Sequence, residues 1–383
     1  QKTESTETLD VALGDLDGDG DLDIVTGNGF IEFKKNQPNA DRQRTIFCGV
    51  TACIVYPELE SMYSYNGKVC LSQVSEQQDR VNEICFQGQS NRIILNDEIN
   101  KFSSEQARRF GDDSLITLSV ALGDLNGDGH LDIVTSNINP YLYKSEPFGL
   151  GMGIVIYWNN GDGYFDKIPP FVLDEVSLPV SLLPEIGQPL TLAGFGDYLM
   201  NNGNMLLNET ISLLNEPSIA LRLAIAHIDD DNVLDIVAAN GSLYVGNGTL
   251  TGKQNTVYLL KRDESNESDI SVKDKRNFGD ESISRGLAIG DINGDTYLDI
   301  VVGNGFAFSE NDISPQQNAI YFNDGHGNFA NDGAHQFGPA AATLSVALGD
   351  MNADGMLDII AGNFAQPDVI YFNDGSCTLT NAM

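Results

Sequence analysis

An acidic segment of nine residues, present in five copies, restricts the folds open to this chain more than any other feature. Its pattern is D-x-[DN]-x-[DN]-G-x-x-D between two short apolar runs, and the copies begin at Asp15, Asp124, His227, Asp291 and Asp350. Oxygen side chains at positions one, three, five and nine, with a backbone carbonyl near position seven, supply the ligands that a cation the size of Ca²⁺ requires. The segment therefore predicts a calcium-binding loop.

Position six of each copy must turn the chain sharply, which favours a positive φ and hence glycine. The third copy has Asn232 there, a mild departure, whereas the fourth has the β-branched Thr296, a more serious one. The third copy also opens with His227, and an imidazole is a poor calcium ligand.

The segment differs from an EF-hand after position six. An EF-hand needs a bidentate Glu at position twelve and a helix on each side. The residues at position twelve here are Thr26, Thr135, Ala238, Val302 and Ala361. The flanking runs alternate with period two and are rich in β-branched residues, so each loop is predicted to join two strands of a hairpin. Asp-Gly sequences also form good hairpin turns without metal, but the repeated acidic spacing favours a metal site.

Composition excludes two classes of partner. Asp and Glu outnumber Lys and Arg by 55 to 21, giving a formal net charge of −34. This charge argues against nucleic acid and anionic membranes as partners. No run of eighteen apolar residues is present, so no membrane insertion is expected. The chain starts with Gln1 and shows no signal peptide, as expected of a mature or trimmed form.

Cysteines and glycosylation sequons favour secretion. Cys48, Cys53, Cys70 and Cys85 fall in one stretch and predict two disulfides in one of three pairings. A zinc site is the alternative, although no C-x-x-C is present. The sequons that could carry glycans are at Asn208, Asn240, Asn247 and Asn266.

Two further repeated elements define a larger unit. Residues 320–329 are predicted to form a strand, an Asn-Asp-Gly turn and another strand, with related copies at 93–102, 154–165 and 369–379. A Phe-Gly dipeptide precedes three of the acidic segments. The unit therefore contains four antiparallel strands, which is one blade of a β-propeller. Trp158, the single Trp, is expected to pack between blades rather than to stack on a sugar.

We therefore predict an all-β fold in which residues 1–383 form a single β-propeller domain with four-stranded antiparallel blades. The first two intervals between acidic segments are nearly twice the last two. Seven blades are favoured, and five or six with insertions are the alternative. The uncertain segments are 30–92, which contains the cysteines, and 166–200. Each is an insertion or a degenerate blade. The C-terminal strands are expected to complete the N-terminal blade, while a neighbouring molecule could supply the missing strand instead.

These motifs resemble those of the FG-GAP (VCBS-type) repeat family, to which the N-terminal propeller of integrin α subunits also belongs. The resemblance is specific over residues 10–28, 110–165 and 278–379, weaker over 220–262, and absent over about 30–90 and 166–198. It implies a seven-bladed propeller whose outer hairpin loops hold Ca²⁺, and an extracellular or cell-surface setting with roles in adhesion, ligand capture or assembly.

By position in the motif, the resemblance implies a set of calcium ligands for three to five ions. They are Asp15, Asp17, Asp19 and Asp23; Asp124, Asn126, Asp128 and Asp132; Asp229, Asp231 and Asp235 in the departing third copy; Asp291, Asn293, Asp295 and Asp299; and Asp350, Asn352, Asp354 and Asp358.

Three functions fit the sequence. The first is a secreted, calcium-binding binding or adhesion module with structural metals, whose partner is an extracellular protein or a glycan. The second is a subunit of an extracellular filament or coat that binds copies of itself. The third is a carbohydrate-active enzyme or a lectin. No catalytic residue is predicted, because none of the four His residues lies in a G-x-S-x-G or H-E-x-x-H arrangement, and a non-enzymatic role is favoured.

Overall fold

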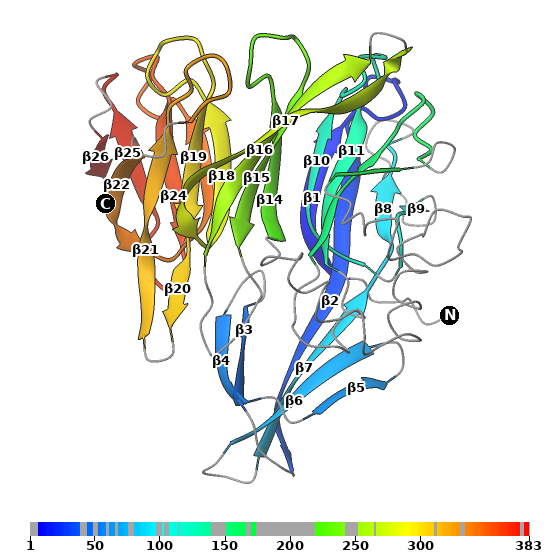
Figure 1. Cartoon of the computed structure of the whole chain (residues 1–383), viewed down its shortest axis with the longest axis vertical. Helices are drawn as coiled ribbons and strands as arrows, with labels where there is room; N and C mark the ends of the chain where they lie inside the picture. The colour runs from blue at the N-terminus through cyan, green and yellow to red at the C-terminus, as the bar shows by residue number, and fades with distance from the viewer. Residues whose placement is uncertain are drawn as a thin grey trace, which may run out of the picture.

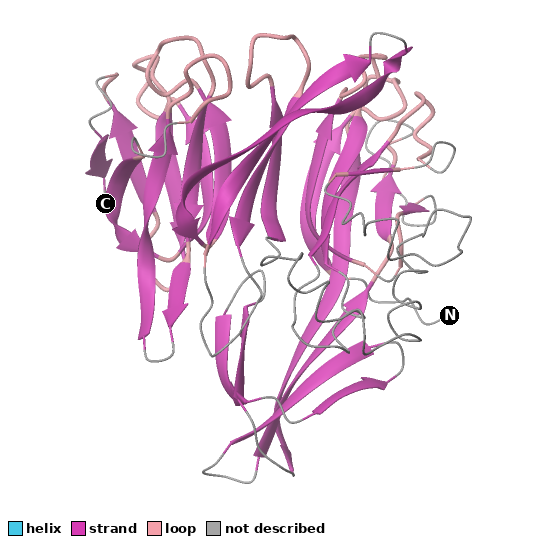
Figure 2. Cartoon of the chain, in the orientation of Figure 1, coloured by secondary structure: helices cyan, strands magenta, loops and turns pink. Residues whose placement is uncertain are grey.

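The computed structural model of the chain describes residues 7–38, 44–48, 53–58, 61–65, 68–75, 80–96, 102, 107–113, 115–138, 151–165, 170–173, 219–241, 252–263, 266–309, 312–329, 334–375 and 379–382. Within these residues the regular secondary structure is entirely β, as Figure 2 shows, and the all-β prediction is confirmed. None of them forms a helix long and apolar enough to cross a membrane.

The described strands form six antiparallel sheets, and five of these share one four-strand order (Figure 1). The first sheet is β1 (Thr8–Gly14), β2 (Asp23–Pro38), β8 (Asn91–Ile94) and β9 (Arg108–Phe110); the second is β10 (Ile116–Gly123), β11 (Asp132–Ile138), β12 (Gly151–Tyr157) and β13 (Phe171–Val172); the third is β14 (Ile219–Ala226), β15 (Asp235–Gly241), β16 (Lys253–Asp263) and β17 (Asn266–Ser282); the fourth is β18 (Ser284–Gly290), β19 (Asp299–Asn304), β21 (Asp312–Tyr321) and β22 (His335–Ala341); the fifth is β23 (Thr343–Gly349), β24 (Asp358–Asn363), β25 (Val369–Asn373) and β26 (Leu379–Ala382). Each predicted acidic segment joins the first two strands of a sheet.

Two hairpins and an extended ladder are added to this order. In the first sheet, β2 continues past the four-stranded part and pairs with β7 (Arg80–Gly88), followed by β6 (Lys68–Ser75) and β5 (Ser61–Tyr65). A separate hairpin contains β3 (Arg44–Cys48) and β4 (Cys53–Glu58), and β20 (Phe306–Ser309) pairs with the start of β21. Strands β5, β6 and β7 of the segment 30–92 therefore extend the first sheet, at the bottom of Figure 1, and lie in the chain between its second and third strands. Residues 174–200 of the other uncertain segment lie outside the described part of the chain.

Hydrophobic clusters between consecutive sheets hold the array together. Their first strands contact one another in the order β1, β10, β14, β18, β23. Between the first two sheets, for example, Leu16 and Val25 pack with Val120 and Ile133. Trp158 packs against the cluster between the second and third sheets, which confirms its predicted role. The second strands β11, β15 and β19 are buried at every residue because their sheets are covered on both faces.

The Phe-Gly dipeptides lie in or next to the fourth strand of a sheet. Phe278, on β17 of the third sheet, contacts the ring of Tyr321, on β21 of the fourth sheet, edge-on, with ring centroids 5.0 Å apart. Gly279 has a φ of +77°, and a Cβ atom there would lie 2.5 Å from the Tyr321 hydroxyl oxygen. Glycine is required at this position because both the backbone conformation and the tyrosine exclude a side chain.

The expected closure through a shared blade is wrong. Strand β1 pairs with β2 of its own sheet, and β26 pairs with β25 of the last sheet. In each of the five sheets that share this order the third strand pairs with the fourth, so the C-terminal strands complete their own four-stranded unit.

The first sheet exposes a face whose counterpart in the second sheet is packed against a neighbouring sheet. In the second sheet, Leu122 and Leu131 lie over Gly14 of the first sheet, where an added Cβ would come within 2.9 Å and 2.7 Å of their methyl carbons. The corresponding pair in the first sheet, Leu13 and Leu22, is 60% and 58% exposed.

The last sheet keeps the complementary open face. Gly349 corresponds to Gly14, yet among the described residues a Cβ atom there would meet only Met351 of its own loop, at 3.8 Å. Met351 is 50% exposed, whereas Leu16 and Ile292, at the same loop position in other sheets, are 1% and 0% exposed. The two terminal sheets thus expose the two halves of the interface that joins consecutive sheets.

Candidate metal-binding loops

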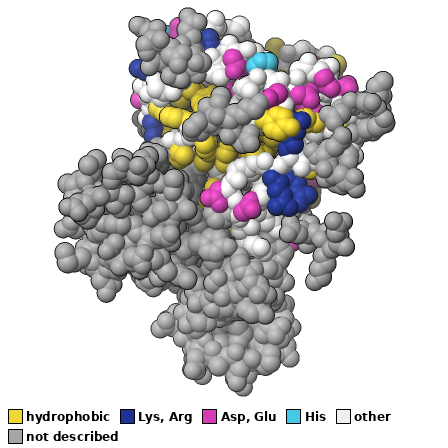
Figure 3. Space-filling model, turned by 90° about the vertical axis from the view of Figure 1, so that its right-hand side faces the viewer, with side chains coloured by type: hydrophobic (Ala, Val, Ile, Leu, Met, Phe, Trp, Pro, Cys, Tyr) yellow, Lys and Arg dark blue, Asp and Glu magenta, His cyan; other side chains and the backbone are white. Residues whose placement is uncertain are grey.

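The acidic loops lie along one edge of the sheets, at the top of Figure 1. Figure 3, viewed from the side, shows acidic side chains gathered at the same end of the molecule. The edge is shared because every loop joins the first strand of a sheet to its second strand.

The first loop brings three predicted ligands together. Asp15, Asp17 and Asp19 each offer a carboxylate oxygen within 4.8 Å of the others. Asp17 Oδ1 is buried and has no hydrogen-bond partner among the described residues. Burial, followed by the charges of Asp23 and Asp19, raises the pKa of Asp17. A buried, unpartnered oxygen among like charges fits a bound cation, and the donor set of oxygens alone fits Ca²⁺.

The position-one carboxylate shapes the backbone of the loop. Asp15 accepts hydrogen bonds from Gly18 N at 2.8 Å and from Gly20 N at 3.0 Å, the residues at positions four and six. Asp124 accepts the same pair, from Gly127 N at 2.7 Å and Gly129 N at 2.9 Å.

The fourth and fifth loops have the same turn. Asp291 accepts from Gly294 N and Thr296 N, and Asp350 accepts from Gly355 N. The second, fourth and fifth loops, which have Asn at position three, share one more contact, because the Asn side-chain amide donates to the position-five carboxylate in each.

The predicted positive φ at position six is confirmed in all five loops. The angles are 93° at Gly20, 91° at Gly129, 64° at Asn232, 77° at Thr296 and 88° at Gly355. Thr296 therefore holds a left-handed conformation that a β-branched residue disfavours. Position four is also left-handed in every loop except the third, and is occupied there by Gly18, Gly127, Gly294 and Ala353.

The carboxylates at position nine are buried and tie each loop to the third strand of its own sheet. Asp132 is fully buried; its Oδ2 accepts from Leu125 N at 3.1 Å and its Oδ1 from Asn159 N at 2.9 Å. The same two bonds recur at Asp23, Asp235, Asp299 and Asp358. These residues were predicted as ligands, and the structure gives each a structural role.

Burial is the main influence on the ionisation of four of these carboxyls, Asp23, Asp132, Asp235 and Asp299. It raises the pKa of Asp132 to about 7, and those of Asp235 and Asp299 to about 6, against the opposing effect of the backbone hydrogen bonds. The pKa of Asp23 is raised for the same reason.

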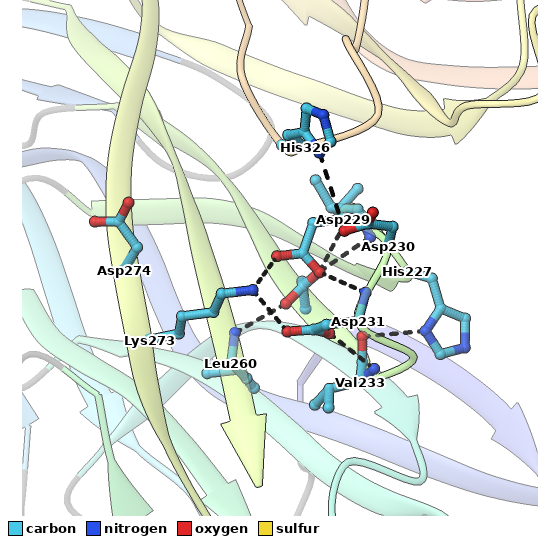
Figure 4. A network of polar contacts seen from close by, with 12 residues as sticks. His227, Asp229, Asp230, Asp231, Val233, Leu260, Lys273, Asp274 and His326 are labelled. Carbon is cyan, nitrogen blue, oxygen red and sulfur yellow. Dashed lines mark hydrogen bonds and ion pairs between the residues drawn. The ribbon is translucent and has the colours of Figure 1, made fainter.

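The third loop differs from the others because a lysine contacts its acidic side chains. Lys273 Nζ on β17 lies 2.7 Å from Asp229 Oδ2 and 2.8 Å from Asp231 Oδ2 (Figure 4). His227, at position one, directs Nδ1 to the carbonyl oxygen of Val233 at 3.0 Å. Asp229 and Asp231 were predicted as calcium ligands, and the structure places an ammonium group between them.

Two sets of asparagines were missed as site residues. One set joins sheets: the Nδ2 atoms of Asn159, Asn323 and Asn373 donate to the position-two carbonyls of the preceding sheet at 2.8, 2.7 and 2.7 Å. Their positions in the Asn-Asp-Gly element were interpreted only as turns.

The other set follows each acidic segment at a constant offset, as Asn28, Asn137, Asn240, Asn304 and Asn363. Asn240 is 3% exposed, and its Nδ2 donates to Gln254 O and Thr256 Oγ1. The Asn240 sequon is therefore a buried structural position, and its prediction as a glycosylation site is wrong. Asn208 and Asn247 lie outside the described residues.

Repeated four-stranded sheets with acidic loops along one edge define a repeat-built all-β protein. The chain contains FG-GAP repeats: the FG-GAP-like repeat model matches residues 306–361, and the FG-GAP repeat model matches residues 117–137 and 285–322. The resemblance predicted from the sequence is thereby confirmed.

No curated protein matches the chain. Among solved structures, the chain is similar to a GH43 β-1,3-galactosidase with galactodeoxynojirimycin, at 10% sequence identity and a TM-score of 0.37. The alignment covers 84% of this chain and 92% of the galactosidase. A likeness at this level carries no argument about activity.

Proposed function

We propose that this chain is an extracellular calcium-binding β-propeller that acts as a binding or adhesion module, with structural metal ions. The observation that carries the proposal is the first loop, where the Asp15, Asp17 and Asp19 carboxylates converge and Asp17 Oδ1 is buried with no hydrogen-bond partner among the residues that the structure describes. Carboxylates brought this close repel one another unless a cation lies among them, and oxygen ligands alone suit Ca²⁺ better than a transition metal.

Four ions are proposed, one in each of the first, second, fourth and fifth loops. The residues that would hold them are the side chains at positions one, three, five and nine. Bound calcium would neutralise carboxylates that repel one another. Because the position-nine carboxylates also bind the third strand, each ion would stabilise the packing of its own sheet.

The propeller assignment is supported by the FG-GAP repeats and by five similar sheets that pack face to face. Five blades are proposed for the described residues, with the strands of 30–92 as an extension of the first blade rather than an additional blade.

The extracellular setting is supported by the register of the cysteines. Cys48 is the direct backbone partner of Cys53, and Cys70 is that of Cys85. Opposite Cα atoms in antiparallel strands lie about 4.5 to 5.5 Å apart, within the span of a disulfide. Of the three pairings, this one is proposed, and peptide mapping under non-reducing conditions would detect it.

The experiment that tests the function is thermal unfolding with and without metal. Excess EDTA should lower the melting temperature by several degrees or more, because calcium at a hundred times its dissociation constant stabilises by about 2.7 kcal/mol per independent site. Readdition of calcium, but not of potassium, should restore it. An unchanged melting curve in EDTA would remove the physical basis of the proposal.

A second candidate function, a self-assembling subunit, is favoured by the exposed faces of the terminal sheets. Leu13 and Leu22 on the first sheet, and Gly349 on the last, occupy the positions that contact one another between interior sheets. Because these faces are different, pairing them between copies gives a head-to-tail contact. The occupant proposed for the exposed face of the first sheet is therefore the last sheet of a second copy.

Sedimentation velocity tests this candidate. The chain should form concentration-dependent oligomers, and the double variant Leu13→Asp with Leu22→Asp should be monomeric. Tyr164→Ser, which alters an exposed aromatic residue elsewhere, serves as the control and should leave association unchanged. A monomeric wild-type chain across a wide concentration range would sink the self-assembly function and leave the calcium-binding function in place.

A further inference from the structure

The third loop has lost two features that calcium loops share, yet it keeps their fold. His227 replaces the position-one carboxylate, and Asp230 at position four lacks the positive φ found in the other loops. The left-handed turn at position six is retained by Asn232, with a φ of 64°. Asp235 also retains both of its bonds, from Ile228 N at 3.0 Å and Leu260 N at 2.8 Å. Something other than a full set of calcium ligands therefore stabilises this loop.

A bulge in the neighbouring strand pair brings a positive charge to the loop. Leu260 of β16 pairs with Val272 and Leu259 pairs with Asp274, so Lys273 between them is the extra residue on β17. A bulge redirects the side chain of the extra residue. The Lys273 ammonium reaches Asp229 and Asp231, the residues at positions three and five, as Figure 4 shows.

The contact is close and partly shielded from solvent. The Asp229 side chain is 4% exposed, that of Asp231 is 25% exposed, and that of Lys273 is 38% exposed. A buried carboxylate is unfavourable without a positive partner, and charge-assisted bonds of 2.7 to 2.8 Å supply one. Hydrogen bonds to Asp229 and then Asp231 raise the pKa of Lys273, so the ammonium stays charged at physiological pH.

We propose that the Lys273 ammonium is the built-in cation of the third loop, occupying the carboxylate pair that holds calcium in the other four, so that this loop folds without metal and excludes calcium. The comparison with the other loops rests on the proposed function. The lysine is covalently attached and always present, so calcium must displace it from both carboxylates. Without a position-one carboxylate, little remains to favour that exchange.

The first test removes the charge in the absence of calcium. Lys273→Met keeps most of the apolar stem, and Lys275→Met makes the same charge change two residues further along β17. In EDTA, Lys273→Met should lower the melting temperature by about 5 °C, because a buried carboxylate loses its partner. Lys275→Met should change it much less. Equal effects of the two variants would overturn the proposal.

The second test counts calcium ions. The double variant His227→Asp with Lys273→Met should bind one ion more than the wild-type chain, whereas His227→Asp alone should bind no more, because Lys273 still occupies the carboxylates. A gain of an ion by His227→Asp alone, or no gain by a folded double variant, would overturn the proposal. If the wild-type chain binds no calcium, the proposed function fails, and the EDTA comparison still decides the role of Lys273.

Discussion

The first and third loops share the left-handed residue at position six, but they differ in the backbone at position four and in what lies beside their carboxylates. In the first, Asp15, Asp17 and Asp19 converge, and Asp17 Oδ1 has no hydrogen-bond partner in the described part of the chain. In the third, the Lys273 ammonium lies between two carboxylates. We infer that the loop fold needs a positive charge beside its acidic side chains, from a metal ion in the first loop and from the lysine side chain in the third.

What the two loops share is the buried carboxylate at position nine. Asp23 and Asp235 each bind the position-two amide and an amide in or directly after the third strand. These contacts fix the ends of the loop in both cases. The comparison thus separates a part that is common to all sheets, the position-nine contact, from a part that varies, the source of the cation.

The largest expected loss of stability comes from substitutions of the position-nine carboxylates, which all the loops share. Asp132→Asn and Asp235→Asn each leave one buried backbone N–H facing a side-chain NH₂, which should destabilise the protein by about 1 to 3 kcal/mol. Urea unfolding in EDTA measures the loss, with the exposed Asp280→Asn as the control. In calcium, Asp132→Asn should lose further stability and Asp235→Asn should not. A similar extra loss in both variants would erase the distinction between the two loops.

The next largest expected effect is the pH dependence of calcium binding, which distinguishes the second loop from the third. Burial raises the pKa of Asp132 to about 7, and a protonated carboxyl does not bind calcium. Below pH 7, the calcium affinity of the second loop should fall about tenfold per pH unit. The third loop should contribute nothing to this change, because Lys273 occupies its Asp229 and Asp231 carboxylates and no calcium ion is proposed there.

Stability without calcium should change in the opposite direction. The Asp132 carboxyl binds its proton more tightly in the folded state, with a pKa of about 7, than in the unfolded state, with a pKa of 3.8. The folded calcium-free protein therefore gains stability as the pH falls from 7 towards 4. Melting temperatures with calcium and with EDTA should converge over this range. A constant difference between them would contradict the assignment of Asp132 as a ligand.

The smallest effects concern the left-handed residues. Thr296→Gly should stabilise the fourth loop by about 1 kcal/mol, since a β-branched residue is strained at a φ of 77°. Ala353→Gly should stabilise the fifth loop by about 0.5 to 1 kcal/mol. Gly355→Ala, at a φ of 88°, is the matched reverse change and should destabilise. Chemical denaturation of the three variants reports the signs, and a loss of stability for Thr296→Gly would show that its side chain makes a compensating contact.

The sequence was enough to predict the hairpin loops, the left-handed residue at position six and the four-stranded repeat, because these depend on local spacing. The role of Lys273 could not be predicted. It depends on a bulge in the pairing of β16 with β17, and register irregularities are not written in the pattern of apolar residues.

The amide contacts between sheets were missed for a related reason. Asn159 reaches the carbonyl of Leu16, far away in the sequence, and only the packing of consecutive sheets brings them together. The Asn-Asp-Gly element suggested a turn, which is a local property. The closure of the array was predicted wrongly because spacing along the chain does not determine which sheet the last strand joins.

The most direct test of the central claim is the number of calcium ions bound by the metal-free wild-type chain, measured by equilibrium dialysis or calorimetric titration. The account predicts four ions per chain, one for each loop with a position-one Asp and none for the loop occupied by Lys273. A count of zero would contradict the role of the acidic loops, and a count of five would contradict the substitution of a lysine for the metal.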